Sequence, residues 1–138
     1  MKITIYHNPR WSKSRKTLQI LNESGKDCTV IEYLKEIPTE DELKVIFNTL
    51  KINPSDGIRK NEAEFKENNL NQYINDKDKM IKSMVKFPKI IERPIVVTPK
   101  GAVIARPPER VFEILWFKYI VNNINYINNI QGPILICI

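Results

Sequence analysis

The apolar positions of the chain change their period several times, and these changes predict the order of its elements. Short β-branched and aromatic runs at residues 3–6 (ITIY) and 28–33 (CTVIEY) predict two strands. Between these runs, Leu18 and Leu21 keep a helical spacing, and Gly25 marks the point where the helix stops. A strand, a helix and a second strand in this order predict a right-handed unit with two parallel strands.

Residues 38–88 keep a helical spacing throughout. Capping boxes begin at Thr39 and Asn61, each with a glutamate three residues later, and Asp76 is a third candidate N-cap. The apolar positions of the first and third helices are Leu43, Ile46, Phe47, Leu50, Met80, Ile81, Met84 and Val85. We interpret the two methionines as core residues rather than ligands, because a flexible thioether fills gaps in a core. The segment therefore predicts a helical insertion between two halves of a sheet.

Two more strands are predicted at residues 94–98 (PIVVT) and 102–105. The connection at 98–101 (TPKG) has the Pro and Gly of a type I turn, which predicts an antiparallel hairpin. Residues 107–109 (PPE) then open a last helix. Its apolar face comprises Val111, Phe112, Leu115, Trp116, Tyr119 and Ile120. Residues 122–138 show no period, and we expect an irregular C-terminal tail there.

The complete order is β-α-β, a helical insertion and β-β-α. It predicts an α/β protein with a four-stranded mixed sheet, the thioredoxin-like fold. A chain of 138 residues with 42% hydrophobic and 28% charged residues suits one domain. We expect this domain to occupy residues 1–121, with the insertion at about 38–88 and the tail at 122–138.

Composition excludes several classes of protein. No stretch reaches the roughly 18 apolar residues of a membrane span, and the N-terminus lacks a signal-peptide pattern, so we expect a cytoplasmic protein without membrane contact. The net charge is +6 and the pI is near 9.3, but the lysines are scattered among acidic residues. This distribution favours an ordinary solvated surface over a nucleic-acid interface. We also expect a monomer.

The two cysteines, Cys28 and Cys137, have neither metal-ligand spacing nor a C-x-x-C motif, so no metal site or structural disulfide is predicted. Cys28 opens the second strand at its amino end, and five residues of strand place it roughly 15 Å from the loop after the first strand. We interpret it as a small buried hydrophobic residue. Cys137 lies on the tail and stays an open candidate for a substitute thiol.

Residues 7–15 join the first strand to the first helix and combine the features of an anion site. Such a junction directs backbone N–H groups and the positive end of a helix dipole at one point. Full positive charges beside it come from Arg10, Lys13 and Arg15. Ser12 is the candidate N-cap. A loop of this kind commonly presents a reactive thiolate, but position 11 is Trp, whose indole N–H donates a hydrogen bond and offers no thiol chemistry.

Four blocks of the sequence, in order, resemble the signature of the glutaredoxin-dependent arsenate reductases. They are residues 6–15 (YHNPRWSKSR), 32–34 (EYL), 92–97 (ERPIVV) and 106–109 (RPPE). The resemblance extends from about residue 2 to residue 115, and four matching blocks are more specific than one. It implies a thioredoxin-like fold, in agreement with the order of elements.

The resemblance also implies a reaction. In that family the loop reads His-Asn-Pro-Xaa-Cys, and its cysteine attacks arsenate to form a covalent arsenic–sulfur adduct. Glutathione, as co-substrate, then attacks the adduct, and the partner glutaredoxin completes the reduction to arsenite. No bound cofactor is implied. Trp11 stands at the position of the nucleophile and is not competent for this attack.

Three arginines of the family hold the oxyanion, and by motif position these are Arg59, Arg93 and Arg106. Planar guanidinium groups bind tetrahedral oxyanions through paired hydrogen bonds, although a surface ion pair is the commoner fate of any single arginine. With the loop, the candidate oxyanion-binding residues are Asn8, Ser12, Ser14, Arg15, Arg59, Arg93 and Arg106. The Arg93–Pro94 bond matches the position of a cis-proline in thioredoxin-like folds. His7 either sets the electrostatics of the loop or simply bonds its backbone.

Three hypotheses follow from these observations. The first is an arsenate reductase-like oxidoreductase acting on arsenate or a similar oxyanion. The second is a catalytically silent relative that binds an oxyanion or a protein, like the Spx regulators of the same fold, although those typically carry a C-x-x-C pair in this loop. The third is a decaying gene product, suggested by Trp11 and the irregular tail.

Overall fold

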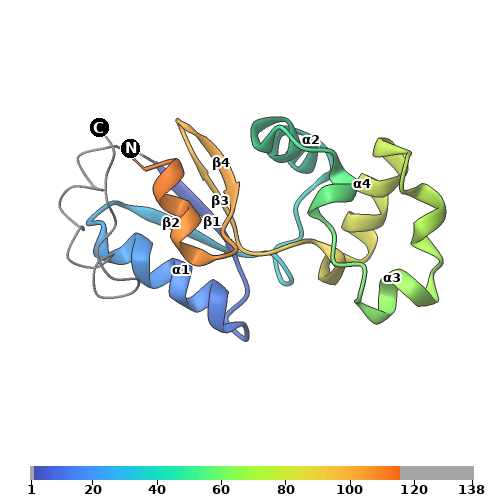
Figure 1. The fold of residues 1–138 in the computed structure, drawn as a ribbon, viewed down its shortest axis with the longest axis horizontal. Coiled ribbons are helices and arrows are strands. Elements are labelled where there is room, and N and C mark those ends of the chain that lie inside the picture. Colours follow the sequence, from blue (N-terminus) through green and yellow to red (C-terminus); the bar gives the residue numbers. More distant parts are fainter. Residues whose placement is uncertain (1, 116–138) are drawn as a thin grey trace.

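The computed structural model describes residues 2–115 and shows an elongated molecule with a sheet at one end and helices at the other (Figure 1). The strands are β1 (Ile3–His7), β2 (Cys28–Glu32), β3 (Ile95–Thr98) and β4 (Gly101–Ile104). The α-helices of the described range are α1 (Ser12–Glu23), α2 (Glu40–Leu50), α3 (Ala63–Glu67) and α4 (Lys77–Lys86). The 3₁₀ helices are η1 (Pro54–Gly57), η2 (Leu70–Tyr73), η3 (Pro88–Ile90) and η4 (Pro108–Glu113).

The four strands form one mixed sheet in the order β2-β1-β3-β4. β1 pairs in parallel with β2, with Tyr6 opposite Ile31, and antiparallel with β3, with Tyr6 opposite Ile95. β3 and β4 form the expected antiparallel hairpin, whose turn ends at Gly101 with a φ of 153°. The sheet confirms the predicted four-stranded mixed arrangement of a thioredoxin-like fold.

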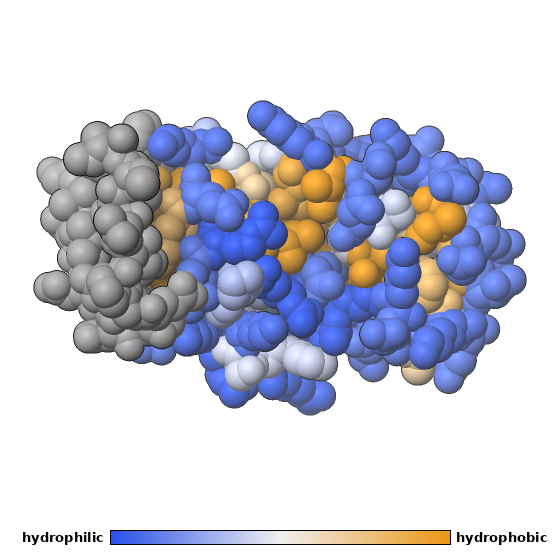
Figure 2. Space-filling view, viewed as in Figure 1, coloured by the Kyte–Doolittle hydropathy of each residue, from blue (hydrophilic) through white to orange (hydrophobic). Residues whose placement is uncertain are grey.

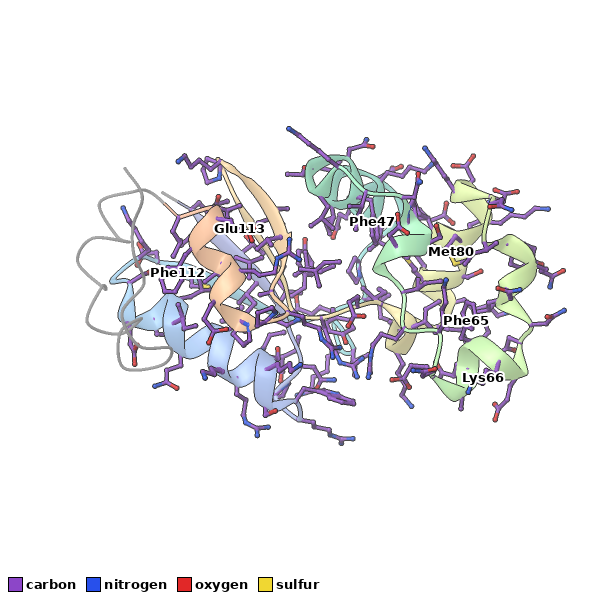
Figure 3. The ribbon with its side chains drawn as sticks, viewed as in Figure 1. Phe47, Phe65, Lys66, Met80, Phe112 and Glu113 are labelled. Carbon is purple, nitrogen blue, oxygen red and sulfur yellow. The ribbon has the colours of Figure 1, made fainter. Side chains whose placement is uncertain are left out.

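Alternate residues of β1 serve two cores, because the side chains of a strand point to opposite faces of a sheet. Ile3 and Ile5 are fully buried in the α1-side core, which also contains Ile20, Leu21, Val96, Val103, Ala105, Val111, Ile114 and Leu115. Tyr6 packs on the other face against the insertion-side core, where Phe47, Phe65 and Met80 lie (Figure 3). Burial of one large apolar side chain contributes about 1.5–3 kcal/mol. α1 is therefore fixed on the sheet, and its first turn lies just after the end of β1.

The helices of the insertion begin largely where their capping residues predict. Thr39 accepts a hydrogen bond from an N–H of the first turn of α2 (3.2 Å), and Asp76 does the same at α4 (3.1 Å). The predicted cap at Asn61 is wrong. α3 begins at Ala63 with Glu62 as its N-cap and without a side-chain capping bond. A helix of five residues has hardly more than one turn, so packing of its single buried aromatic residue decides where it lies.

The last element differs from the predicted α-helix. It is the 3₁₀ helix η4, and Pro108, Val111 and the C-cap residue Ile114 are buried at intervals of three residues. This interval is the 3₁₀ period, and over so short a segment the sequence spacing fits both helix types. Positions 116, 119 and 120 of the predicted apolar face, and the whole predicted tail at 122–138, lie outside the described residues. Within residues 2–115, no helix is both long and apolar enough to cross a bilayer.

Cys28 is half-buried rather than buried as expected, because β2 is an edge strand of the sheet and packs on one side only. The register places it opposite Ile3, whereas Glu32 at the other end of β2 is opposite His7. Its thiol therefore lies at the end of the sheet away from the β1–α1 loop, as the sequence predicts. Burial raises the pKa of this thiol, which makes it a poor nucleophile.

The close packing of Gly57 against Phe47 gives a prediction for stability. A Cβ atom added at Gly57 would lie 2.3 Å from Cε1 of Phe47, whose ring is itself buried. We expect Gly57→Ala to lower the free energy of unfolding by about 1–3 kcal/mol in urea denaturation, because the core is overpacked. Phe47→Leu removes the obstructing ring, so the added methyl group should cost less in that background. Equal losses in the two backgrounds would contradict the contact.

Candidate functional site

The β1–α1 loop (residues 8–11) is held by the hydroxyl group of one serine. Ser14 is fully buried, and its Oγ lies 2.7 Å from Nδ1 of His7 and accepts a hydrogen bond from the backbone N–H of Asn8 (3.0 Å). One oxygen atom therefore joins the end of β1, the start of the loop and the first turn of α1. The ring of His7 thus bonds a side chain of α1 and not the loop backbone, the bond that the sequence offered as one alternative.

The other bonds of the loop are also internal. The side chain of Asn8 accepts a hydrogen bond from the N–H of Arg10 (3.1 Å), and the guanidinium of Arg15 donates to the carbonyl of Pro9 (2.9 Å). Ser14 and Arg15, both predicted to bind an oxyanion, thus hold the loop itself. The conformation of the loop is therefore set by hydrogen bonds within residues 7–15.

The first turn of α1 leaves donors for an anion. Trp11, and not Ser12 as predicted, is the N-cap, and it makes no side-chain capping bond. Within residues 2–115, the backbone N–H groups of residues 12–14 donate to no acceptor, and no acidic residue lies in this turn. These donors sit at the positive end of a 12-residue helix dipole.

Arg93 brings a buried charge to the same place. Its side chain is 5% exposed and donates to the hydroxyl of Tyr33 (3.3 Å) and to the carbonyl of Lys89 (3.2 Å). Its Nε atom is buried and has no partner among the described residues. A buried donor without a partner is costly, so this Nε–H is a position at which an additional acceptor would be favourable.

Two glutamates connect the three predicted arginines. Oε1 of Glu92 lies 2.7 Å from a terminal nitrogen of Arg106 and 3.9 Å from Nε of Arg59. Oε1 of Glu62 contacts Arg59 and lies 3.6 Å from Arg93. The carboxylates thus separate guanidinium groups that would otherwise repel each other.

The indole of Trp11 lies at the centre of this group and is 43% exposed. The Cζ atoms of Arg93 and Arg59 are 4.0 Å and 4.4 Å from its ring centroid, which is the range of cation–π interactions. Two cavities adjoin the indole and share Arg93. The smaller cavity, of about 200 Å³, is lined by Trp11, Ser12, Lys13, Ser14, Arg93 and Arg106. The larger cavity, of about 320 Å³, is lined by Asn8, Arg10, Trp11, Leu34, Glu62, Lys89 and Arg93.

The space-filling view shows the most hydrophilic residues in the middle of the molecule, between the sheet and the outer helices of the insertion (Figure 2). The sequence placed Asn8, Ser12, Arg93 and Arg106 at one site, and the structure brings them to these two neighbouring cavities. Arg59 lines neither cavity and contacts the site through its cation–π contact with the indole of Trp11.

The peptide bonds before Pro94 and Pro107 are both cis, and only the first of these was expected from the sequence.

Sequence reasoning missed four residues of the site: Tyr33, Glu62, Lys89 and Glu92. Glu92 stands directly before Arg93, and Glu62 follows Arg59 by three residues, so spacing offered a signal for both. Tyr33 and Lys89 contact Arg93 only through the tertiary fold. Among residues 2–115, no group of three His, Cys, Asp or Glu side chains is placed to hold a metal ion.

Comparison with known proteins agrees with this geometry. The model of the ArsC family matches residues 6–114, which include every candidate site residue. The chain belongs to the ArsC family. It is 42% identical over 113 residues to the arsenate reductase of Escherichia coli strain K12, a match covering 82% of this chain and 80% of that protein. The arsenate reductase of Acidiphilium multivorum has the same identity and coverage.

Solved structures of this family share the fold. The arsenate reductase from Vibrio cholerae superimposes with a TM-score of 0.79 at 43% sequence identity, covering 83% of this chain and 98% of that one. An ArsC family related protein from Bacteroides fragilis, at 21% identity, still gives a TM-score of 0.72 over 83% of this chain. The ArsC fold is thus retained even where the sequences have diverged widely.

The environment of His7 predicts how stability depends on pH. Burial, together with the charge of Arg15, lowers its pKa below the usual value of 6.5, although Glu32 and Ser14 oppose the shift. Near pH 6.5, His7 therefore binds a proton more readily in the unfolded chain than in the folded protein. As a result, the free energy of unfolding falls as the pH drops from about 7.5 to 5.5. Denaturation of the wild type and His7→Gln at several pH values tests this. His7 is the sole histidine, so an unchanged slope in the variant would refute the assignment.

Proposed function

We propose that the recess around Trp11 binds arsenate, or an oxyanion of the same shape, as the arsenate site of this family. The observation that carries the proposal is the convergence of the α1 N-terminus with Arg93 and Arg106 on the smaller cavity. Two arsenate reductases that are 42% identical over most of this chain support the choice of ligand. A tetrahedral oxyanion matches both kinds of donor.

Binding follows from donors that are already in place. The N–H groups at the start of α1 and the hydroxyl of Ser12 provide one set, and the guanidinium groups of Arg93 and Arg106 provide another. The oxyanion replaces Glu92 as a partner of Arg106, because two negative groups on one guanidinium repel each other. Recognition therefore exchanges one carboxylate contact for contacts with several donors.

The residue at position 11 decides whether reduction follows binding. The family reaction starts when a thiolate attacks arsenic, and an indole has no nucleophilic group that forms such an adduct. The chain with Trp11 therefore holds the oxyanion without reducing it, and glutathione and glutaredoxin have no adduct to act on. Cys28 carries the one thiol of the described range, and it lies at the end of the sheet away from the loop that contains Trp11.

The codon for residue 11 distinguishes two origins of this residue. Trp and Cys codons differ at a single third base, and UGA is read as Trp, stop or selenocysteine in different decoding systems. A UGA codon read as selenocysteine would place a selenol at position 11 and give the reductase hypothesis its nucleophile. A UGG codon would favour the second candidate, a catalytically silent oxyanion-binding relative. The indole favours that candidate because both neighbouring guanidinium groups pack on it in an ordered arrangement.

Oxyanion binding is measurable by calorimetry. We expect the purified chain to bind arsenate and phosphate, and Arg93→Lys to weaken both at least tenfold, because lysine cannot make paired hydrogen bonds. Arg110→Lys is the matched control, since Arg110 is an exposed arginine paired with Glu113 outside the cavities. Equal binding by the two variants would show that the recess is not the oxyanion site.

Reduction is testable by restoring a thiol. We expect purified protein with glutathione and glutaredoxin to produce no more arsenite than Trp11→Ala, and Trp11→Cys to produce arsenite above both. The helix dipole and the nearby arginines should lower the pKa of the new thiol. A correctly folded Trp11→Cys protein that binds arsenate but does not reduce it would overturn the assignment of position 11. Arsenite production by the original chain would overturn the claim that it only binds.

A further inference from the structure

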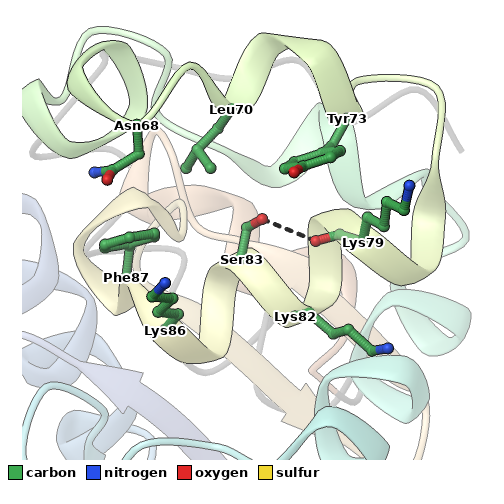
Figure 4. Close-up of a pocket in the computed structure, with 8 residues that line it drawn as sticks. All are labelled: Asn68, Leu70, Tyr73, Lys79, Lys82, Ser83, Lys86 and Phe87. Carbon is green, nitrogen blue, oxygen red and sulfur yellow. Dashed lines mark hydrogen bonds between the residues drawn. The ribbon is translucent and has the colours of Figure 1, made fainter.

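Another cavity, in the insertion, lies away from Trp11. It has a volume of about 400 Å³ and opens between η2 and α4, with Leu70 and Tyr73 on one side and Ser83 and Phe87 on the other (Figure 4). No residue lines both this cavity and the two beside the indole. This volume lies in the range of sites for small molecules.

The rim of this cavity is positively charged. Lys79, Lys82 and Lys86 follow one face of α4, and none of the residues lining the cavity is acidic. Lys79 and Lys86 stand seven residues apart, so the three lysines are spread over about 10 Å of helix. Asp76 stands 4.0 Å from Lys79 and partly balances that end, whereas the described residues show no carboxylate within ion-pair distance of Lys82 or Lys86. The charge therefore favours an anion.

The interior of this cavity offers apolar and aromatic surface. Leu70 is 3% exposed and forms part of the wall. The ammonium of Lys79 lies 5.5 Å from the ring centroid of Tyr73, and that of Lys86 lies 5.4 Å from the ring of Phe87. Each end of the cavity thus pairs an aromatic face with a cation.

The hydroxyl of Ser83 adds a polar contact to this interior. It donates to the carbonyl of Lys79 (2.8 Å), and Ser83 is one of the residues that line the cavity (Figure 4). The opposite face of α4 buries Met80, Ile81 and Met84 in the insertion-side core. The lysines of α4 therefore lie outside the insertion-side core.

We propose that this cavity is a second binding site, for a small anion that carries a flat aromatic ring. The ring stacks against Tyr73 or Phe87, because aromatic faces pack favourably at 4.5–7 Å. The negative group meets Lys82 and Lys86, which have no acidic partner in the described chain. Nucleoside phosphates and aromatic carboxylates share this chemistry, and a test with one of each separates them.

Amide shifts in ¹⁵N NMR spectra locate the binding. We expect AMP or 2-naphthoate to shift the amides of residues 68–73 and 79–87, while adenosine and inorganic phosphate shift them at least tenfold more weakly at equal concentration. A nucleotide site would respond to AMP alone, and an aromatic acid site would respond to 2-naphthoate. If neither probe shifts these amides at millimolar concentration, the proposal is wrong.

Variants separate the site from general surface charge. We expect Lys82→Gln/Lys86→Gln to weaken binding of the responding probe at least fivefold, and Tyr73→Leu to weaken it by a similar factor. Lys66→Gln/Lys77→Gln is the matched control, because it removes the same charge from exposed positions of the insertion outside the cavity. Equal losses in the two double variants would overturn the proposal, since they would show only long-range attraction. Arsenate binding should stay unchanged in all three.

Discussion

The recess depends on keeping several positive charges together in one small volume. Three guanidinium groups, the N-terminus of α1 and one indole meet there, and like charges at this spacing repel each other. Glu62 and Glu92 relieve the repulsion, because one oxygen of each contacts two arginines. The carboxylates thus keep the arginines ordered, and in the proposed function an oxyanion needs only to displace Glu92 from Arg106. Such preorganisation is what makes charged sites bind effectively.

The fold was largely predictable because its signals are local. Strand periods, the caps at Thr39 and Asp76, and the turn before Gly101 each act over a few residues, and the structure agrees with them. The errors occur where local signals are ambiguous. η4 is a 3₁₀ helix because six residues fit both helical periods, and α3 is too short for a cap to fix its start.

The site was less predictable, because its members come from distant segments. The loop around Trp11 was recognisable from its sequence, but the contact of Arg93 with Tyr33 joins residues that are 60 positions apart. Such a contact follows from strand order and from packing of the insertion, and no spacing along the chain reveals it. Ser14 illustrates the opposite case. Its hydroxyl was assigned to a ligand, whereas the fold uses it to hold the loop.

The proposed function separates binding from chemistry in this recess. In that proposal, binding relies on donors from α1 together with Arg93 and Arg106, whereas nucleophilic attack relies on one atom of the side chain at position 11. The side chain of an N-cap projects outward from the helix start, so a bulky ring fits there without disturbing the α1-side core. Cation–π contacts with two guanidinium groups contribute roughly 0.5–2 kcal/mol each, which offsets part of the charge repulsion. In the proposed function, Trp at the position of the family nucleophile therefore lacks the attacking atom and still leaves the cationic recess intact.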